Sequence, residues 1–450
     1  MDLEEKDKKY IWHPFTQMKD YCLGKPLIIT KGEGVYLYDN YNRKYIDGVS
    51  SLWLTLHGHQ KKELDNAVKS QLKKIAHTTL LGLSHPAAIE LAEKLVGIAP
   101  KGLTKVFYSD NGATSVEIAL KIAYQYWKQK TGPRTKKEKF IAFRNSYHGD
   151  TIGAVSVGGI SLFHGCYKSL LFETIFADYP YCYRCEGKQY CKEINKSQCV
   201  KKIERLIKKN SNEIAGLVIE PLIQGAGGMI AAPPGFLKEI KNICSEYNVL
   251  LIADEVATGF GRTGAMFACM KEDVAPDILC AAKGITGGYL PLAATLVTEN
   301  IYKAFWGDYK DKKTFFHGHS YTGNPLGCAA ALANLEVFRK ENIIEKLGPK
   351  INCFTKLLEK FRALEHVGDI RQCGMMAGIE LVKNKSSKTP YLWEEKIGIK
   401  VTEESRENGL IIRPLGNVIV LMPPLSISRN ELKSMIDIVF KAIKKITNGE

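Results

Sequence analysis

The sequence predicts an α/β protein with two lobes: a large lobe built on a mostly parallel sheet covered by helices on both faces, and a smaller α+β lobe. The chain has 450 residues, more than one hydrophobic core usually holds. Strand-like and helical segments alternate from about residue 87 to residue 332, as in parallel sheets. Within that region, two apolar runs end in Asp254 and Lys283. Runs that are apolar on both faces indicate buried strands.

Residues 1–75 are predicted to form the first part of the small lobe and a linker helix. Residues 26–51 alternate short β-like runs with Gly and Asp-Asn turn signals, which predicts a small antiparallel sheet. The linker helix follows because apolar residues from Leu64 to Ile75 recur at helical spacing.

Residues 76–335 are predicted to form the large lobe, with a cysteine-rich insertion at 180–200. Its expected elements are a helix opened by Pro86, strands 105–110, 139–145, 215–220, 248–254 and 276–283, and helices 114–128 and 234–247. Residues 336–450 complete the small lobe. There we expect a helix over 344–364, strands 376–382 and 418–424, and a closing helix from Arg429.

Composition and charge indicate a soluble enzyme rather than a nucleic-acid or membrane protein. The apolar fraction is 45% and the charged fraction 25%, which is ordinary for a globular enzyme. The amino terminus has no apolar core and glycines or polar residues interrupt the hydrophobic stretches, so we expect a cytoplasmic protein without a membrane span. The net charge of +15 comes from scattered lysines, which favours solvated helix faces over a nucleic-acid surface.

Asp254 and Lys283 together indicate pyridoxal phosphate chemistry. Each side chain follows a buried strand, at the sheet edge where open α/β sheets bind ligands. An amine can form a Schiff base with the cofactor aldehyde, and a carboxylate can pair with the ring nitrogen and keep it protonated. The sequence therefore predicts pyridoxal 5'-phosphate as cofactor and transamination as the reaction.

A phosphate site is predicted in the turn from Ser109 to Thr114. This turn joins a strand to an amphipathic helix, and free amides at a helix start attract anions. Gly112 and Ala113 are the expected phosphate contacts. A tight connection without a ligand is the alternative interpretation.

Further candidates follow other strands of the large lobe. Tyr147 is predicted to stack on the cofactor ring, and Asp150 to orient its neighbours. His148 is either a proton carrier or, more commonly for a lone histidine, a hydrogen-bonded structural residue. Glu220 supplies a third carboxylate with either a structural or a supporting role.

Two arginines and one polar loop are candidate ligand contacts. Arg262 and Arg413 could each bind a substrate carboxylate, because a guanidinium matches carboxylate geometry, and Arg413 is the favoured choice. Ser320 and Thr322, in a glycine-rich turn, offer hydroxyls to a phosphate oxygen and could reach it across a dimer interface.

The insertion raises the question of a metal. Its candidate ligands are Cys182, Cys185, Cys191 and Cys199. The first pair has metal-ligand spacing, but the second half does not repeat it and no histidine lies within the segment. We therefore favour a reduced loop and predict no metal. The other cysteines are dispersed, which indicates a reducing compartment.

Taken together, these motifs resemble the class III aminotransferases, a pyridoxal-phosphate family of fold type I, over nearly the whole chain. The resemblance is carried by blocks that include DGVSSLWLTLHGH, FYSDNGATSVEIALKIAYQYW, FRNSYHGDTIGAVSVG, IEPLIQGAGGM, IADEVATGFGRTGAMFAC, FFHGHSYTGNPLGCAAA and IRPLGNVIVLMPP. Within the family, the blocks are most similar to the branch that converts 8-amino-7-oxononanoate to 7,8-diaminononanoate in biotin biosynthesis.

The resemblance implies a homodimer and assigns roles by position. Cofactor contacts would be Gly112, Ala113, Tyr147, Asp254 and Lys283, with His319 and Ser320 at the phosphate and Ser320 supplied by the second subunit. Substrate contacts would be Phe15, Leu52, Trp53, Tyr147, Gly318 and Arg413, the last binding the carboxylate of the keto acid.

The amino donor stays open between S-adenosylmethionine and L-lysine. Members that use adenosylmethionine carry Tyr in the opening HPYT motif and a pair of Trp, whereas this chain has Phe15 and Leu52 and keeps only Trp53. These replacements resemble the Bacillus-type branch and favour lysine. Two alternatives remain. The first keeps the cofactor but acts on ornithine, 4-aminobutyrate or a similar amine, or catalyses an isomerisation within one molecule; the second is a metal- or nucleic-acid-binding protein.

Overall fold

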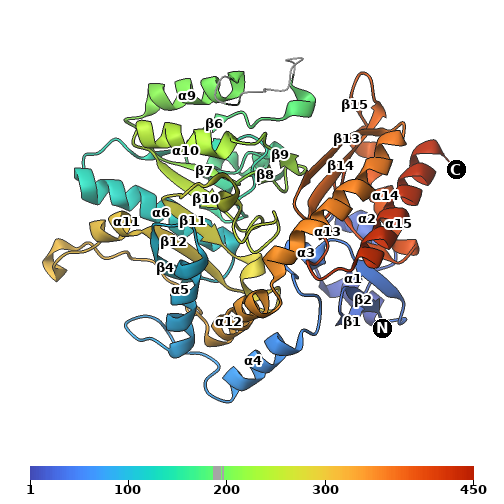
Figure 1. The fold of residues 1–450 in the computed structure, drawn as a ribbon, viewed down its shortest axis with the longest axis horizontal. Coiled ribbons are helices and arrows are strands. Elements are labelled where there is room, and N and C mark those ends of the chain that lie inside the picture. Colours follow the sequence, from blue (N-terminus) through green and yellow to red (C-terminus); the bar gives the residue numbers. More distant parts are fainter. Residues whose placement is uncertain (186–193, 195–196, 450) are drawn as a thin grey trace.

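The computed structural model describes residues 1–185, 194 and 197–449. Figure 1 shows the elements from both ends of the chain side by side, and the central elements gathered around a large sheet on the other side. The predicted domain limits at residues 75 and 335 stay a prediction.

The large sheet has seven strands in the order β4-β12-β11-β10-β7-β5-β6. The strands are β4 (Leu103–Ser109), β5 (Lys139–Phe143), β6 (Thr174–Ala177), β7 (Ile214–Ile219), β10 (Leu250–Asp254), β11 (Ile278–Ala281) and β12 (Ala293–Thr298). β12 runs antiparallel to both neighbours, β11 and β4, whereas the pairs from β11 to β6 are parallel. The predicted mostly parallel α/β sheet is confirmed.

Helices cover both faces of this sheet (Figure 1), because its central strands are buried along their whole length. One face carries α6 (Gly112–Thr131), whose apolar side chains pack on the sheet in one hydrophobic cluster. The other face carries α9 (Gln198–Asn210) and α10 (Phe236–Glu246), which contribute to a second cluster. The other helices of this region are α4 (Lys62–Leu72), α5 (Pro86–Ile98), α7 (Ile152–Ser156), α8 (Ser161–His164), α11 (Glu299–Ala304) and α12 (Pro325–Lys340).

Two smaller sheets join the ends of the chain. The first contains β1 (Ile29–Glu33), β2 (Tyr36–Asp39), β3 (Lys44–Asp47) and, parallel to β3, β16 (Leu410–Ile411). The second contains β13 (Val367–Cys373), β14 (Met376–Asn384), β15 (Thr389–Pro390), β17 (Arg413–Leu415) and β18 (Val418–Leu421). A hairpin is formed by β8 (Ile223–Gln224) and β9 (Ile230–Ala231). The helices beside these sheets are α1 (Leu3–Tyr10), α2 (Met18–Leu23), α3 (Ser50–Trp53), α13 (Ile343–Leu358), α14 (Ile397–Glu407) and α15 (Arg429–Asn448).

Two strands of the large sheet were not predicted. β6 has four residues and three of them are only partly buried, so its apolar signal is weak. β12 follows the turn after Lys283 and returns antiparallel beside β11, a direction that an apolar run does not specify. Among the described residues, no helix combines the length and apolarity that crossing a bilayer requires.

Candidate active site

A cavity of about 710 Å³ lies at the carboxyl ends of β10 and β11 and contains most of the predicted chemical groups. Its lining includes Trp53, Asp110, Gly112, Ala113, Tyr147, His148, Glu220, Asp254 and Lys283. The position agrees with the rule that open α/β sheets bind ligands beyond the carboxyl ends of their strands. Its volume falls within the usual range for small-molecule sites.

Asp254 ends β10 and is held by His148. Asp254 is 4% exposed, and its Oδ2 lies 2.7 Å from Nδ1 of His148, while Oδ1 accepts a hydrogen bond of 3.0 Å from the amide of Val256. The histidine is thus fixed by the carboxylate, as the structural interpretation of His148 expects. Its Nε2 is buried and finds no hydrogen-bond partner in the part of the chain that the structure describes.

Lys283 follows β11 and has a left-handed backbone conformation, with φ of +43°. A non-glycine residue adopts this conformation only where the surroundings enforce it, commonly at functional sites. Burial lowers the pKa of the Lys283 amine, and the nearby carboxylates of Asp254 and Glu220 oppose that shift. The amine is therefore available as a nucleophile more readily than an exposed lysine. Its Nζ lies 5.6 Å from the centre of the Trp53 ring.

The predicted phosphate turn opens α6. Asn111 caps the helix, its side chain accepting from the amide of Thr114 at 3.0 Å. The amides of Gly112 and Ala113 belong to the first turn, where no helical acceptor exists. A Cβ on Gly112 would come 2.5 Å from Cγ1 of Val256, so only glycine fits this position without movement of its neighbour.

Tyr147 is fixed at both ends. Its amide donates to Oε1 of Glu220 at 3.0 Å, and its hydroxyl donates to Asp150 at 2.7 Å. The other oxygen of Glu220 accepts from the amide of Gly225 at 2.8 Å. Burial raises the pKa of Glu220 to about 7. Glu220 therefore supports the loop that carries Tyr147, and its buried carboxyl titrates near neutrality.

These residues fit pyridoxal phosphate. A first-turn amide pair suits a phosphate, Asp254 suits a protonated ring nitrogen, and Lys283 offers the amine. Trp53 lines the cavity, and its indole Nε1 is buried and has no hydrogen-bond partner among the described residues.

The segment that carries Trp53 has a strained backbone, which the sequence analysis missed. Ser51 and Trp53 have φ of +61° and +67°. Asp47 holds the segment: its carboxylate accepts from the amide of Ser51 at 2.8 Å and lies 3.1 Å from Nε2 of His59. An aspartate just before a Gly-Val-Ser-Ser run was the available signal.

Four predicted substrate residues, Phe15, Leu52, Gly318 and Arg413, lie outside the lining of this cavity. Arg413 on β17 is partly buried, and its Cζ lies 5.9 Å from the centre of the Phe15 ring. Burial and Asp150 raise the pKa of the Tyr147 hydroxyl, and the positive charge of Arg413 opposes this shift. Phe15 and Leu52 are 55% and 46% exposed.

The predicted ligand contacts in the loop before α12 lie in different surroundings: one is held at the cavity, two are exposed and one bonds within the loop. Nδ1 of His319 lies 2.6 Å from Oδ2 of Asp110, which lines the cavity. Gly318 and Ser320 are exposed and do not line the cavity of their own chain. Thr322 is used locally, because its hydroxyl accepts from the amide of His319 at 2.9 Å.

Arg262 is not a substrate clamp, so that interpretation was wrong. Its side chain is 1% exposed and donates to the carbonyls of Pro423 at 2.7 Å and Thr55 at 3.1 Å. Arg262 therefore links the loop after β10 to the segment after α3, at Thr55, and to the segment after β18, at Pro423. The motif GFGRTG gives no sign of this, because the acceptors are distant in sequence.

Three of the four candidate metal ligands lie among the described residues. Cys182 opens a short 3-10 helix (Cys182–Arg184), Cys185 follows it, and Cys199 lies in α9. Cys191 lies outside the described residues. Within residues 1–185, 194 and 197–449, no group of three or more His, Cys, Asp or Glu side chains is arranged to hold a metal.

Comparison with known proteins gives full-length matches. The profile of the family Aminotransferase class-III matches residues 21–443. A protein of Aquifex aeolicus named adenosylmethionine-8-amino-7-oxononanoate aminotransferase is 54% identical over 446 residues, covering 99% of this chain and 97% of that protein. The crystal structure of a protein with the same name from Methanocaldococcus jannaschii superposes with a TM-score of 0.94 at 50% identity and covers 98% of both chains. An (S)-enantioselective ω-transaminase from Thermomicrobium roseum superposes with a TM-score of 0.94 at 34% identity, covering 99% of this chain and 98% of that one.

Proposed function

The chain belongs to the class III aminotransferases, which depend on pyridoxal phosphate, and we propose that it transfers an amino group from S-adenosylmethionine to 8-amino-7-oxononanoate. The product is 7,8-diaminononanoate, an intermediate of biotin biosynthesis. The observation that carries this proposal is the full-length identity of 50% and 54% with two proteins named for this donor and this acceptor. The ω-transaminase of nearly equal structural similarity is only 34% identical.

The donor proposed here differs from the one that Phe15 and Leu52 favoured. Lysine was preferred because a hydroxyl and an indole are missing from the expected donor pocket. Proteins more than half identical to this chain are nevertheless named for adenosylmethionine. Leu52 is 46% exposed and does not line the cavity, so its change from Trp removes little from the enclosed part of the site.

When bound, pyridoxal phosphate supplies an aldehyde that accepts amino groups and a protonated ring that withdraws electrons from the attached carbon. Lys283 would hold the cofactor covalently and, once displaced by substrate, move a proton at the substrate carbon that carries nitrogen. Asp254, fixed by His148, would keep the ring nitrogen protonated. Gly112 and Ala113 would hold the phosphate, and Tyr147 would lie over the ring.

We further propose that Arg413 binds the carboxylate of the keto acid. Partial burial lowers the pKa of Arg413, Tyr147 opposes this shift, and no carboxylate among the described residues pairs with the guanidinium. A carboxylate at this position would complete the pairing that buried charges require.

We propose a homodimer in which Gly318 and Ser320 of one chain complete the site of a second copy. Both residues are exposed in the single chain. The neighbouring Phe316 and Tyr321 are 80% and 63% exposed, which is unusual for adjacent large aromatic residues and is typical of an interface. Sedimentation of the holoenzyme tests this: a single-chain mass at micromolar concentration would contradict it. The cytoplasmic location stays a prediction.

The test of the reaction is an assay on 8-amino-7-oxononanoate. Purified holoenzyme is supplied with S-adenosylmethionine or L-lysine in separate reactions, and 7,8-diaminononanoate is measured by mass spectrometry. We expect product with S-adenosylmethionine. Product with lysine alone would overturn the donor, and turnover of ornithine or 4-aminobutyrate with no diamine formed would overturn the acceptor.

A further inference from the structure

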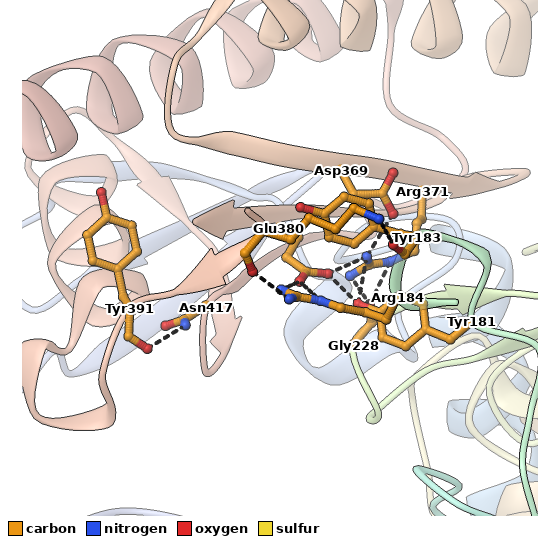
Figure 2. Close-up of polar contacts among 10 residues, drawn as sticks. Tyr181, Tyr183, Arg184, Gly228, Asp369, Arg371, Glu380, Tyr391 and Asn417 are labelled. Atoms are coloured by element: carbon orange, nitrogen blue, oxygen red, sulfur yellow. Dashed lines mark hydrogen bonds and ion pairs between the residues drawn. The ribbon is translucent and has the colours of Figure 1, made fainter. Parts of the chain in front are cut away.

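A buried ionic cluster lies between the start of the cysteine-rich insertion and the C-terminal sheet, away from the cavity. Figure 2 shows Glu380 of β14 between Arg184 and Arg371. Arg371 donates to Glu380 at 2.5 Å and to Asp369 at 2.9 Å. Arg184 donates to Glu380 through Nε at 3.0 Å and also through Nη2, and the hydroxyl of Tyr181 donates to the same carboxylate. The side chains of Arg371 and Glu380 are only 7% and 6% exposed.

The cluster is balanced in charge and rich in hydrogen bonds. Two arginines face two carboxylates, so no buried charge is left uncompensated. Desolvation of a buried ion pair roughly cancels its attraction, and such clusters therefore add little to stability on average. A better documented role of such clusters is to fix the relative placement of the segments that they join.

Arg371 reaches from the cluster to a glycine-rich turn that borders the active site. Its Nη2 donates to the carbonyl of Gly228 at 2.8 Å, and its Nε donates to the carbonyls of Gly228 and Met229 at 3.2 and 3.1 Å. The turn is closed by hydrogen bonds from the amides of Gly228 and Met229 to the carbonyl of Gly225. Gly225 in turn donates to Glu220, which accepts from the amide of Tyr147.

The strand register connects Arg371 to Arg413 on the other side. Arg371 pairs with Gly378, Gly378 with Val420, and Val420 with Arg413. Residues directly opposed on neighbouring strands point to the same face, so both arginines project from one face of this sheet. The turn lies on that face, because a Cβ on Gly378 would come 2.8 Å from Cβ of Met229 and 3.3 Å from the carbonyl oxygen of Gly228.

The contacts therefore connect the two sides of the site. Hydrogen bonds run from Tyr147 through Glu220 and the 225–229 turn to Arg371, and the strand register places Arg413 in the same row of the sheet as Arg371. We propose that Arg371, locked by Glu380 and by Tyr181 and Arg184 of the insertion, is a positioning residue that sets the placement of Arg413 relative to Tyr147. Tyr181 and Arg184 thereby act on carboxylate recognition without touching substrate. This inference rests on the proposed role of Arg413 as carboxylate anchor.

The first test measures carboxylate binding without turnover. Nonanoate, which has the carboxylate and chain length of the keto acid but no keto or amino group, is titrated calorimetrically into holoenzyme of wild type, Arg371→Lys, Arg184→Gln and Arg413→Gln. Lysine keeps the charge of Arg371 but loses the planar fork, so we expect Arg371→Lys to weaken nonanoate binding about tenfold and Arg184→Gln about threefold, as for loss of one or two hydrogen bonds. Arg339→Lys changes an exposed arginine that pairs with Glu336 on the surface, and this control should bind nonanoate as wild type does.

The second test separates positioning from general damage. The half-reaction of each holoenzyme with hexylamine, an amine without a carboxylate, is followed by the absorbance of the bound cofactor, alongside its thermal midpoint and its affinity for pyridoxal phosphate. We expect Arg371→Lys and Arg184→Gln to match wild type in the hexylamine rate and in cofactor affinity, while KM for the keto acid rises and kcat changes little.

Three outcomes would overturn the inference. Equal losses with hexylamine and nonanoate would show a merely structural role for the cluster. Unchanged nonanoate binding in both cluster variants would show no role at all. If Arg413→Gln binds nonanoate as tightly as wild type does, Arg413 is not the carboxylate anchor and the inference fails. Failure of the proposed function is distinguishable, because an enzyme inert toward 8-amino-7-oxononanoate could still bind nonanoate through Arg413 and show the cluster effect.

Discussion

Asp254 and Lys283 lie in a cavity at the ends of two central strands, whereas Phe15, Leu52 and Ser320 are exposed and do not line that cavity. The first group is fixed by the sheet and by hydrogen bonds of the same chain, including the pair of Asp254 and His148. Phe15 and Ser320 lie outside helices and strands, and Leu52 lies in the short helix α3; all three side chains are exposed. Asp254 and Lys283, which we call the chemical half of the site, are therefore fixed within one chain, whereas the placement of the exposed group and of Arg413, which we together call the selective half, depends on separate segments.

The largest expected effect tests the chemical half. Lys283→Ala should lower the rate of diamine formation by at least about 10³-fold, because it removes both the covalent attachment and the proton carrier. Borohydride treatment followed by peptide mass spectrometry checks the attachment: wild type should keep the cofactor on Lys283 and the variant should not. Lys303→Ala, an exposed lysine on α11, is the control. Retained activity in Lys283→Ala would place the chemistry elsewhere.

A smaller loss is expected from the carboxylate at the ring. Asp254→Asn should reduce kcat by about 10²- to 10³-fold. The neutral amide cannot stabilise the protonated ring nitrogen of the bound cofactor as the carboxylate does. His148→Gln should lose less, because the carboxylate remains. The absorbance of the bound cofactor should shift in Asp254→Asn and hardly change in His148→Gln. An equal loss of kcat in both variants would mean that His148 does more than hold Asp254.

The selective half is tested at Arg413. Arg413→Gln should raise KM for the keto acid by about 10- to 100-fold, as for loss of a charged hydrogen-bonding pair. The rate with hexylamine should stay near wild type, and Arg339→Gln serves as the control on an exposed arginine. If KM for the keto acid stays unchanged, another group binds the carboxylate.

The last prediction concerns stability and pH and has no direct effect on the reaction. Burial raises the pKa of Glu220 from 4.5 to about 7, so between those values the folded protein keeps a proton that the unfolded chain has lost. Its contribution is fully present below pH 4.5 and is lost as pH rises to 7, at about 1.4 kcal/mol per pH unit. Glu220→Gln should abolish this part of the loss of stability between pH 4.5 and 7. Thermal midpoints of holoenzyme from pH 4.5 to 8 check it, with exposed Glu246→Gln as control, and an unchanged slope would contradict the assignment.

Local sequence specified much of the large sheet and of the buried site. The strands ending near Asp254 and Lys283 were predictable because continuous apolar runs have few alternatives to a buried strand. The turn at Gly112 was predictable because a strand, a small-residue turn and an amphipathic helix occur in immediate succession. These features need only neighbouring residues.

Contacts between distant segments were not predictable in the same way. Arg262 and Arg413 both follow apolar runs and both looked suited to a carboxylate, but Arg262 donates to the carbonyls of Thr55 and Pro423. The strand β6 and the antiparallel direction of β12 also escaped prediction. Burial and pairing partners arise from the packing of segments that a local pattern does not relate.

By itself, the sequence determined the order of the elements, the buried strand ends and the identity of the groups that can perform amino transfer, because hydrophobic periodicity and side-chain chemistry are local properties. The tertiary structure decided which of those groups share one cavity and which arginine is buried as a structural tie. It also decided that Arg371 and Arg413 stand in one row across a sheet. Those outcomes depend on strand register and on contacts between distant segments, where each donor finds its acceptor only after the chain has folded.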